Sequence, residues 1–234
     1  MPNWCHNTVT VEGSEADVMA FALAAQNDEQ PLTFNAHVPE PSQDVYEAME
    51  QDSAVRCNLC GGTGTRPTTA SEASSIGAEF QPAWEEFDFL QKARELAVAD
   101  RPKCNGCSGS GRYNPTPAWY SWHTENWGTK WDATFDGPFM ALATDSAASV
   151  SGSVASNGLA LVPGMAVYRF DTAWGPPDAW LERVAKACPK LTFTLRYGEP
   201  GNDFAGQVVA EHGEVTSNVA LPIDDVLDSG EMWF

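Results

Sequence analysis

The sequence is short of basic residues, it has few cysteines outside one repeated motif, and it has no long apolar run. Its 234 residues include 6 cysteines and 13 lysines and arginines, against 32 aspartates and glutamates. No stretch reaches the roughly 18 apolar residues that a membrane-spanning helix needs. The N-terminal MPNWCHNTVT has neither the basic nor the apolar region of a signal peptide. We therefore expect a globular protein of the cytoplasm that does not enter a membrane.

The shortage of basic residues limits the partners that the chain can bind. The formal net charge is -19, and residues 1–55 hold ten acidic side chains and no lysine or arginine. Binding to a nucleic-acid backbone depends on lysine and arginine, so direct backbone binding is not expected. An acidic surface instead suits a basic protein surface or a nucleic-acid-binding cleft, which leaves a DNA-mimic inhibitor open as one interpretation.

Several motifs of catalytic sites are also missing. The sequence contains no P-loop, no dinucleotide-binding glycine motif and no nucleophile elbow. A zinc-dependent base deaminase requires a His-x-Glu motif upstream of its C-x-x-C pair, and none of the four histidines stands in that setting. The sequence therefore predicts no catalytic residue, although an enzyme is not ruled out.

Four of the six cysteines fall in an octet, C-x-x-C-x-G-x-G, that occurs twice. It reads CNLCGGTG at residues 57–64 and CNGCSGSG at residues 104–111. Two C-x-x-C pairs supply four thiolates for a tetrahedral ion, and glycines let the backbone curl around the sulfurs. We predict one Zn²⁺ on Cys57, Cys60, Cys104 and Cys107. Because all four ligands are protein thiolates, the site is closed to water and structural rather than catalytic.

The octet resembles the cysteine-rich repeat of DnaJ-type chaperones, in which four copies make two zinc centres. Here two copies suffice for one centre, and the chain has no J-domain His-Pro-Asp signature. The resemblance therefore implies a zinc-binding fold and not a co-chaperone.

Hydrophobic periodicity predicts an α+β fold around the octets. Strands are expected at residues 5–11, 32–41 and 166–174, helices at 14–26 and 176–189, and an antiparallel pair over 191–215. This order is typical of a ferredoxin-like antiparallel sheet with helices on one face. The charge balance changes sharply near the octets, so we expect a core domain of residues 1–53 and 114–234, interrupted by a zinc-binding insert at 54–113. A helix at 81–99 is expected between the octets.

Tryptophan is unusually dense after the second octet, in WYSWHTENWGTKWD. These side chains suit either a core wedge between helix and sheet or the floor of a ligand groove on which a base stacks. The residues of the possible groove are Trp119, Tyr120, Trp122, His123, Asn126, Trp127, Lys130, Trp131 and Asp132. If the groove were catalytic, Lys130 would pair an anionic group of a nucleotide and Asp132 would act as the base.

Three separated pieces of the chain resemble the YubB family of plasmid and bacteriophage proteins. They are MPNWCHNTVTVEG, NWGTKWD, and FDTAWGPP followed by LRYGEPGNDFAG. The resemblance implies a ferredoxin-like domain and a mobile-element origin, and it transfers no catalytic residue. We therefore expect a non-enzymatic protein of the host-cell cytoplasm that engages a host component, such as one of its defences. The alternatives are a nucleotide-binding protein or enzyme, and an acidic DNA mimic.

Overall fold

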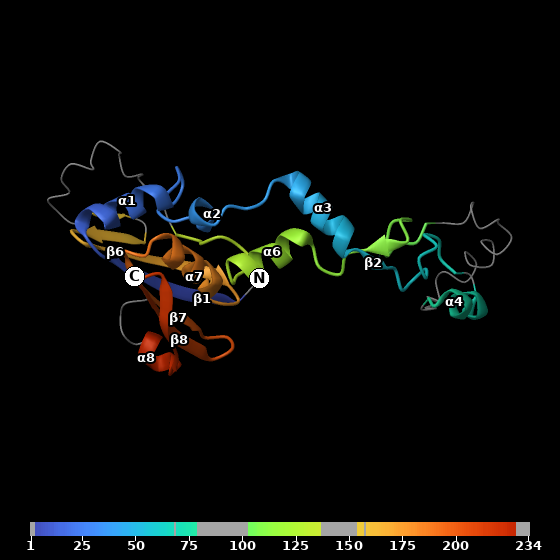
Figure 1. Ribbon diagram of the computed structural model, residues 1–234. Coiled ribbons are helices and arrows are strands. Elements are labelled where there is room, and N and C mark those ends of the chain that lie inside the picture. Colours follow the sequence, from blue (N-terminus) through green and yellow to red (C-terminus); the bar gives the residue numbers. More distant parts are fainter. Residues whose placement is uncertain (1–2, 68, 79–102, 137–153, 157, 228–234) are drawn as a thin grey trace. The chain divides into compact units, whose positions relative to one another are not determined.

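The computed structural model describes residues 3–67, 69–78, 103–136, 154–156 and 158–227 (Figure 1). Contacts divide the chain into two compact units, one of Met1–Pro41 with Trp119–Phe234 and one of Ser42–Ala118. The octets lie in the second unit. The limits 54–113 for a separate insert stay a prediction, as does the helix at 81–99, which lies outside the described residues. Among the described residues, no helix combines the length and apolar character that crossing a bilayer demands.

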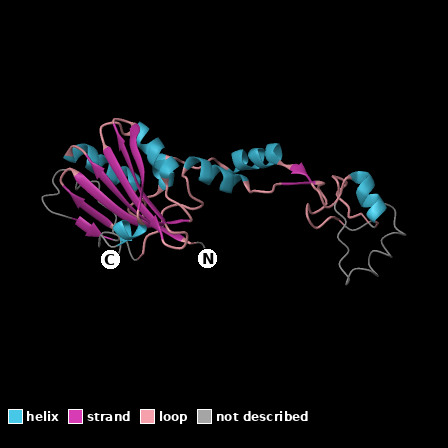
Figure 2. Cartoon of the chain, turned by 90° about the horizontal axis from the view of Figure 1, so that it is seen from below, coloured by secondary structure: helices cyan, strands magenta, loops and turns pink. Residues whose placement is uncertain are grey.

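The first unit is built on a seven-stranded sheet in which every neighbouring pair is antiparallel (Figure 2). Its order is β4-β5-β6-β1-β7-β8-β9. The strands are β1 (Trp4–Glu12), β4 (Val154–Ser156), β5 (Leu159–Val162), β6 (Met165–Ala173), β7 (Thr192–Glu199), β8 (Phe204–Glu211) and β9 (Glu214–Leu221). The helices of this unit are α1 (Glu15–Ala25), α2 (Phe34–His37), α6 (Ala118–Asn126, whose first residue belongs to the second unit), α7 (Asp178–Ala187) and α8 (Ile223–Leu227).

Strand β1 lies at the centre of the sheet between β6 and β7. It is antiparallel to both, so β6 and β7 run parallel to each other with helix α7 as their crossover. This split βαβ arrangement is a feature of ferredoxin-like folds. The predicted α+β class with a ferredoxin-like antiparallel sheet is confirmed.

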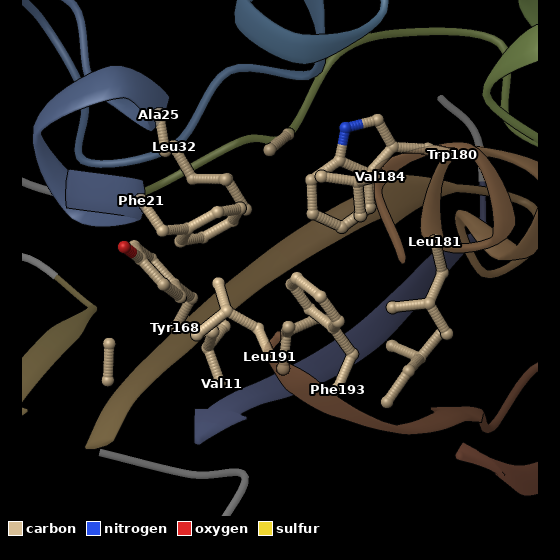
Figure 3. Close-up of a cluster of buried hydrophobic side chains, with 14 of the residues drawn as sticks. Val11, Phe21, Ala25, Leu32, Tyr168, Trp180, Leu181, Val184, Leu191 and Phe193 are labelled. Atoms are coloured by element: carbon tan, nitrogen blue, oxygen red, sulfur yellow. The ribbon is translucent and has the colours of Figure 1, made fainter. Parts of the chain in front are cut away.

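The core lies between one face of this sheet and helices α1 and α7 (Figure 3). Alternate residues of β1, such as Val9 and Val11, are fully buried, as period-two alternation requires. Trp180 and Leu181 of α7 and Phe21 of α1 pack onto them. Both long helices therefore cover the same face, as predicted.

Helix α8 packs on the other face of the sheet. Leu195 of β7 points into the core, so its neighbour Arg196 points to the opposite face. There the Arg196 guanidinium donates a hydrogen bond to the carbonyl of Asp225 in α8 (3.4 Å). The chain after β9 thus continues into this short helix.

The helix predicted at residues 14–26 is confirmed as α1, and its first turn shows why. The Ser14 hydroxyl accepts a hydrogen bond from the Asp17 amide at 3.1 Å, which satisfies an amide that the helix leaves open. Glu15 and Asp17 place negative charge at the same end, where the helix dipole favours it.

The strand predicted at residues 32–41 is wrong, because the structure has the short helix α2 there. The reason is a contact from far along the chain. The Asp132 carboxylate accepts hydrogen bonds from the Thr33 hydroxyl and the Phe34 amide, at the start of α2. This side-chain acceptor replaces the strand neighbour that the sequence pattern implied.

The second unit contains α3 (Gln43–Ser53), α4 (Ala70–Ile76) and a two-stranded sheet of β2 (Val55–Arg56) and β3 (Arg112–Tyr113). Strand β2 ends directly before the first octet, and β3 begins directly after the second. Their pairing therefore brings Cys57 next to Gly111. Among the described residues of this unit, the hydrophobic cluster consists of the four cysteines with Leu59 and Tyr113 packed against them.

Candidate metal centre

The structure brings the four predicted ligands together. The Sγ atoms of Cys57, Cys60, Cys104 and Cys107 all lie within 4.8 Å of one another, and all four residues are buried. The Sγ atoms of Cys57 and Cys104 are 3.8 Å apart, and those of Cys60 and Cys107 are 3.7 Å apart. A Zn–S bond of about 2.3 Å puts the ligands of a regular tetrahedron about 3.8 Å apart, so both distances fit a zinc tetrathiolate.

An approximate twofold symmetry relates the two octets. The Cys57 amide donates to the Gly111 carbonyl (2.9 Å), and the Cys104 amide donates to the Gly64 carbonyl (2.8 Å). The residue before each first cysteine pairs with the residue after the other octet's last glycine, in the bridges Arg56↔Arg112 and Thr65↔Lys103. Each octet therefore supplies two of the four cysteines and forms backbone hydrogen bonds with the other octet.

The residue between the two octet glycines also has the same role in both copies. The hydroxyl of Thr63 donates to the Cys60 carbonyl at 2.8 Å, and that of Ser110 donates to the Cys107 carbonyl at 2.7 Å. A hydroxyl at this position fixes the turn that follows the second cysteine of each pair. The sequence pattern alone left this position unassigned.

The octet glycines are required by backbone geometry at two equivalent positions. Gly64 and Gly111 both have φ of +77°, in the left-handed region that favours glycine. A Cβ on Gly64 would lie 2.3 Å from the carbonyl oxygen of Gly109, and a Cβ on Gly111 would lie 2.3 Å from that of Gly62. The two loops thus approach each other too closely for any side chain.

Backbone amides supply positive charge to the sulfurs. The Gly111 amide donates to Cys107 Sγ at 3.3 Å. Burial opposes ionisation of Cys107, but the amides of Gly111 and Gly109 outweigh it and lower the pKa of this thiol to about 7. Burial instead raises the pKa of Cys104 to about 12 in the absence of an ion. A cation removes this penalty, because it pairs directly with the thiolates.

The centre is closed on all sides by protein. Its four donors are sulfurs, which suits soft or borderline ions such as zinc, and within the described ranges no carboxylate or imidazole joins the cluster. Such a site can hold two loops together and has no position for a substrate or an activated water. The remaining cysteines lie apart from it: Cys5 is buried in the sheet and Cys188 is half-buried after α7.

The nine residues of the predicted ligand groove fall into two groups. The first group packs inside the protein. Trp127 is 1% exposed and donates its indole hydrogen to the Val38 carbonyl (3.0 Å), and His123 stacks on it with ring centroids 4.2 Å apart. The His123 Nδ1 donates to the Lys130 carbonyl at 2.7 Å. Trp122 packs against the core, and Asn126 donates to the Trp122 carbonyl at 2.8 Å.

Asp132 also belongs to this inner group. Its carboxylate accepts hydrogen bonds from Thr33, Phe34 and the Ala133 amide. Burial raises the pKa of this carboxyl despite those bonds, which favour the charged form. A carboxylate with three structural donors anchors α2 to the segment after α6, and this contact gives it a role in the fold.

The second group forms a surface cluster of aromatic rings around the ammonium of Lys130. It contains Trp119, Tyr120 and Trp131 from the predicted set and adds Trp174, which follows β6. Trp4 joins the edge of the cluster, with its ring 6.2 Å from that of Trp131. Sequence reasoning missed Trp4 and Trp174, because only the pairing of Trp4 with Ala173 in the sheet brings them to this end.

Comparison with known proteins supports the fold of the first unit. Residues 159–228 match the family model described as the ferredoxin-like domain in Api92-like protein, a range that runs from β5 into the end of α8. A crystal structure of a protein api92 from Yersinia pseudotuberculosis is 12% identical, with a TM-score of 0.43, and the alignment covers 94% of this chain and 98% of that one. No curated protein sequence matches. The C-terminal part of the chain is therefore similar to the ferredoxin-like domain of Api92-like proteins.

Proposed function

We propose that this chain is a non-enzymatic binding protein in which one structural Zn²⁺ holds the octet loops in place. The four-cysteine cluster carries the proposal, since its sulfur spacing matches a zinc tetrathiolate. In the described part of the second unit, buried apolar side chains outside the cysteines are few: Tyr46, Ala73 and Ala118. An ion therefore takes the place of a hydrophobic core.

The partner that we propose is a protein of the host cell, bound in the host cytoplasm by a bacteriophage or plasmid product. The resemblance of three pieces of the sequence to the YubB family supports the mobile-element origin. The net charge of -19 supports a partner with a basic surface, because unlike charges attract and orient the encounter. Because residues 1–55 are acidic and contain no lysine or arginine, a DNA mimic is the second form of the same proposal.

Native mass spectrometry of protein purified without chelator tests the metal, and affinity capture tests the partner. We expect one zinc per chain, and a host protein that the intact chain retains and the Cys60→Ser variant releases. Cys188→Ser is the matched control, because Cys188 lies outside the cluster. A metal-free chain, or capture that is equal for the intact and Cys60→Ser chains, contradicts the proposal. Release of the partner by moderate salt favours the DNA mimic, since a charge-matched surface is sensitive to screening.

A further inference from the structure

Five residues from three distant segments form a compact surface cluster, which we call the Lys130 cluster. The Lys130 Nζ lies 4.5 Å from the ring centroid of Trp131 and 4.8 Å from that of Trp174. It lies 5.9 Å from the ring centroids of Trp119 and Tyr120. Tyr120 in turn meets Trp174 edge to face, with ring centroids 6.5 Å apart. All five residues belong to the first compact unit.

The cluster is accessible to solvent. Trp131 is 38% exposed and Trp174 is 44% exposed, and they are the two tryptophans among the exposed large hydrophobic residues of the described chain. Exposed indoles cost hydration free energy, and proteins place them at binding surfaces more often than elsewhere. Here the two exposed indoles lie beside the Lys130 ammonium.

Lys130 has no carboxylate within ion-pair distance among the residues that the structure describes. Its Nζ lies over aromatic rings, which attract the positive charge but accept hydrogen bonds only weakly. An unpaired ammonium is unexpected in a chain with 32 acidic residues. The ammonium is thus available to an anion from outside the chain.

The backbone at Trp174 gives an independent indication of function. Its φ is +70°, a region that bulky residues rarely occupy. The Trp174 amide donates to the Asn3 carbonyl at 2.9 Å, so the conformation is fixed by a backbone contact that glycine would make with less strain. A strained, exposed tryptophan that the fold does not need is the kind of outlier that marks a binding site.

From these observations we propose that the Lys130 cluster binds a nucleoside phosphate. A base stacks on the exposed indole of Trp174, and the Lys130 ammonium leaves the ring face to pair with the phosphate. The exchange is favourable because phosphate oxygens satisfy N–H donors that the rings leave unsatisfied, and the vacated ring gains a stacking partner. This goes beyond the proposed function and does not depend on the zinc centre.

The ligand comes either as a free nucleotide or as the terminal nucleotide of a single strand. Both present the same base and phosphate to the cluster. The charge of -19 repels a long polyanion, so the contact is limited to one or two phosphates. The experiment therefore compares both sources.

Isothermal titration calorimetry of the intact chain at low ionic strength tests the proposal with four probes. They are adenosine 5′-monophosphate (AMP), adenosine, ribose 5-phosphate, and a 5′-phosphorylated single-stranded hexanucleotide. We expect AMP to bind more tightly than adenosine or ribose 5-phosphate, because only AMP offers both groups. A hexanucleotide that binds more tightly than AMP identifies the end of a strand as the source, and one that binds equally or more weakly identifies the free nucleotide.

Two variants and one control assign the binding to the cluster. Lys130→Gln is expected to weaken AMP binding by about tenfold and to leave adenosine binding unchanged. Trp174→Gly, which also relieves the left-handed strain, is expected to weaken both ligands by roughly fivefold or more. Lys190→Gln is the control for a lost positive charge, since the Lys190 side chain is 80% exposed. Lys190 lies just before β7, whose first residue, Thr192, pairs with Glu12 at the end of β1. Trp4 is the first residue of β1, so Lys190 and Trp4 lie at opposite ends of this strand.

The proposal is overturned if AMP does not bind at millimolar concentration, or if it binds equally to the wild type and to both variants. Binding of adenosine as tight as that of AMP also overturns it, since Lys130 would then have no anion to pair. Thermal melting of each variant accompanies the titrations. If Trp174→Gly fails to fold, the Lys130→Gln comparison still decides the proposal.

Discussion

Removal of the metal is expected to unfold the octet region and leave the ferredoxin-like sheet intact. Structural zinc in small cysteine-rich modules contributes about 10–16 kcal/mol at neutral pH, which is as large as the whole stability of an ordinary domain, about 5–15 kcal/mol. The described residues around the octets have no aliphatic core that could replace this contribution. The sheet has its own core, in which none of the four cysteines takes part.

Hydrogen exchange with mass spectrometry, before and after treatment with a strong chelator, measures the loss of structure separately in the octet region and in the sheet. Protection is expected to disappear at the Cys57 and Cys104 amides, whose hydrogen bonds join the two octets. Protection of β1 is expected to persist, because β1 and its neighbours β6 and β7 all belong to the first unit, which does not contain the octets. Cys60→Ser should give the same pattern without chelator, whereas Cys188→Ser should exchange like the wild type. Octet amides that stay protected in metal-free protein would refute the reasoning, because the fold of this region would then not depend on an ion.

Three further predictions concern single residues. Gly64→Ala should weaken zinc binding and lower the melting temperature of the octet region more than Gly77→Ala, since both residues have positive φ but a Cβ has open space only at Gly77. Asp132→Ala should destabilise the sheet unit by about 2–5 kcal/mol in urea unfolding, because it leaves buried donors without an acceptor; a loss below 0.5 kcal/mol would argue against this structural role. Burial raises the pKa of Cys5 to about 12, so this thiol should resist alkylation at pH 9 in the folded protein while Cys188 reacts. Since the folded state holds the Cys5 proton more tightly than the unfolded state, its contribution to stability should be lost as the pH rises from 9 toward 12.

Patterns of local origin were read correctly from the sequence. The Ser14 cap and the apolar spacing after it define α1, and the period-two alternation of residues 5–11 defines the central strand. The octets also predicted which four cysteines cluster, because C-x-x-C spacing places two sulfurs close together whatever surrounds them. The positive φ of the octet glycines followed from the same pattern.

Patterns whose outcome depends on residues distant in the sequence were misread or missed. The segment at 32–41 alternates like a strand, but the Asp132 carboxylate caps it as a short helix. Strand β9 was not predicted beyond its first residues; it lies at the sheet edge, where most of EVTSNVAL is exposed.

By itself, the sequence determined the secondary-structure class, the sheet type and the set of four cysteines that cluster, since each depends on neighbours a few residues apart. Only the tertiary structure decided that two octets 47 residues apart pair as symmetric halves of one centre. It also separated the tryptophans into a buried group and a surface group. Local sequence cannot make that separation, because an indole suits a core and a surface equally well, and the choice rests on whether β1 brings Trp4 and Trp174 to the same end of the sheet.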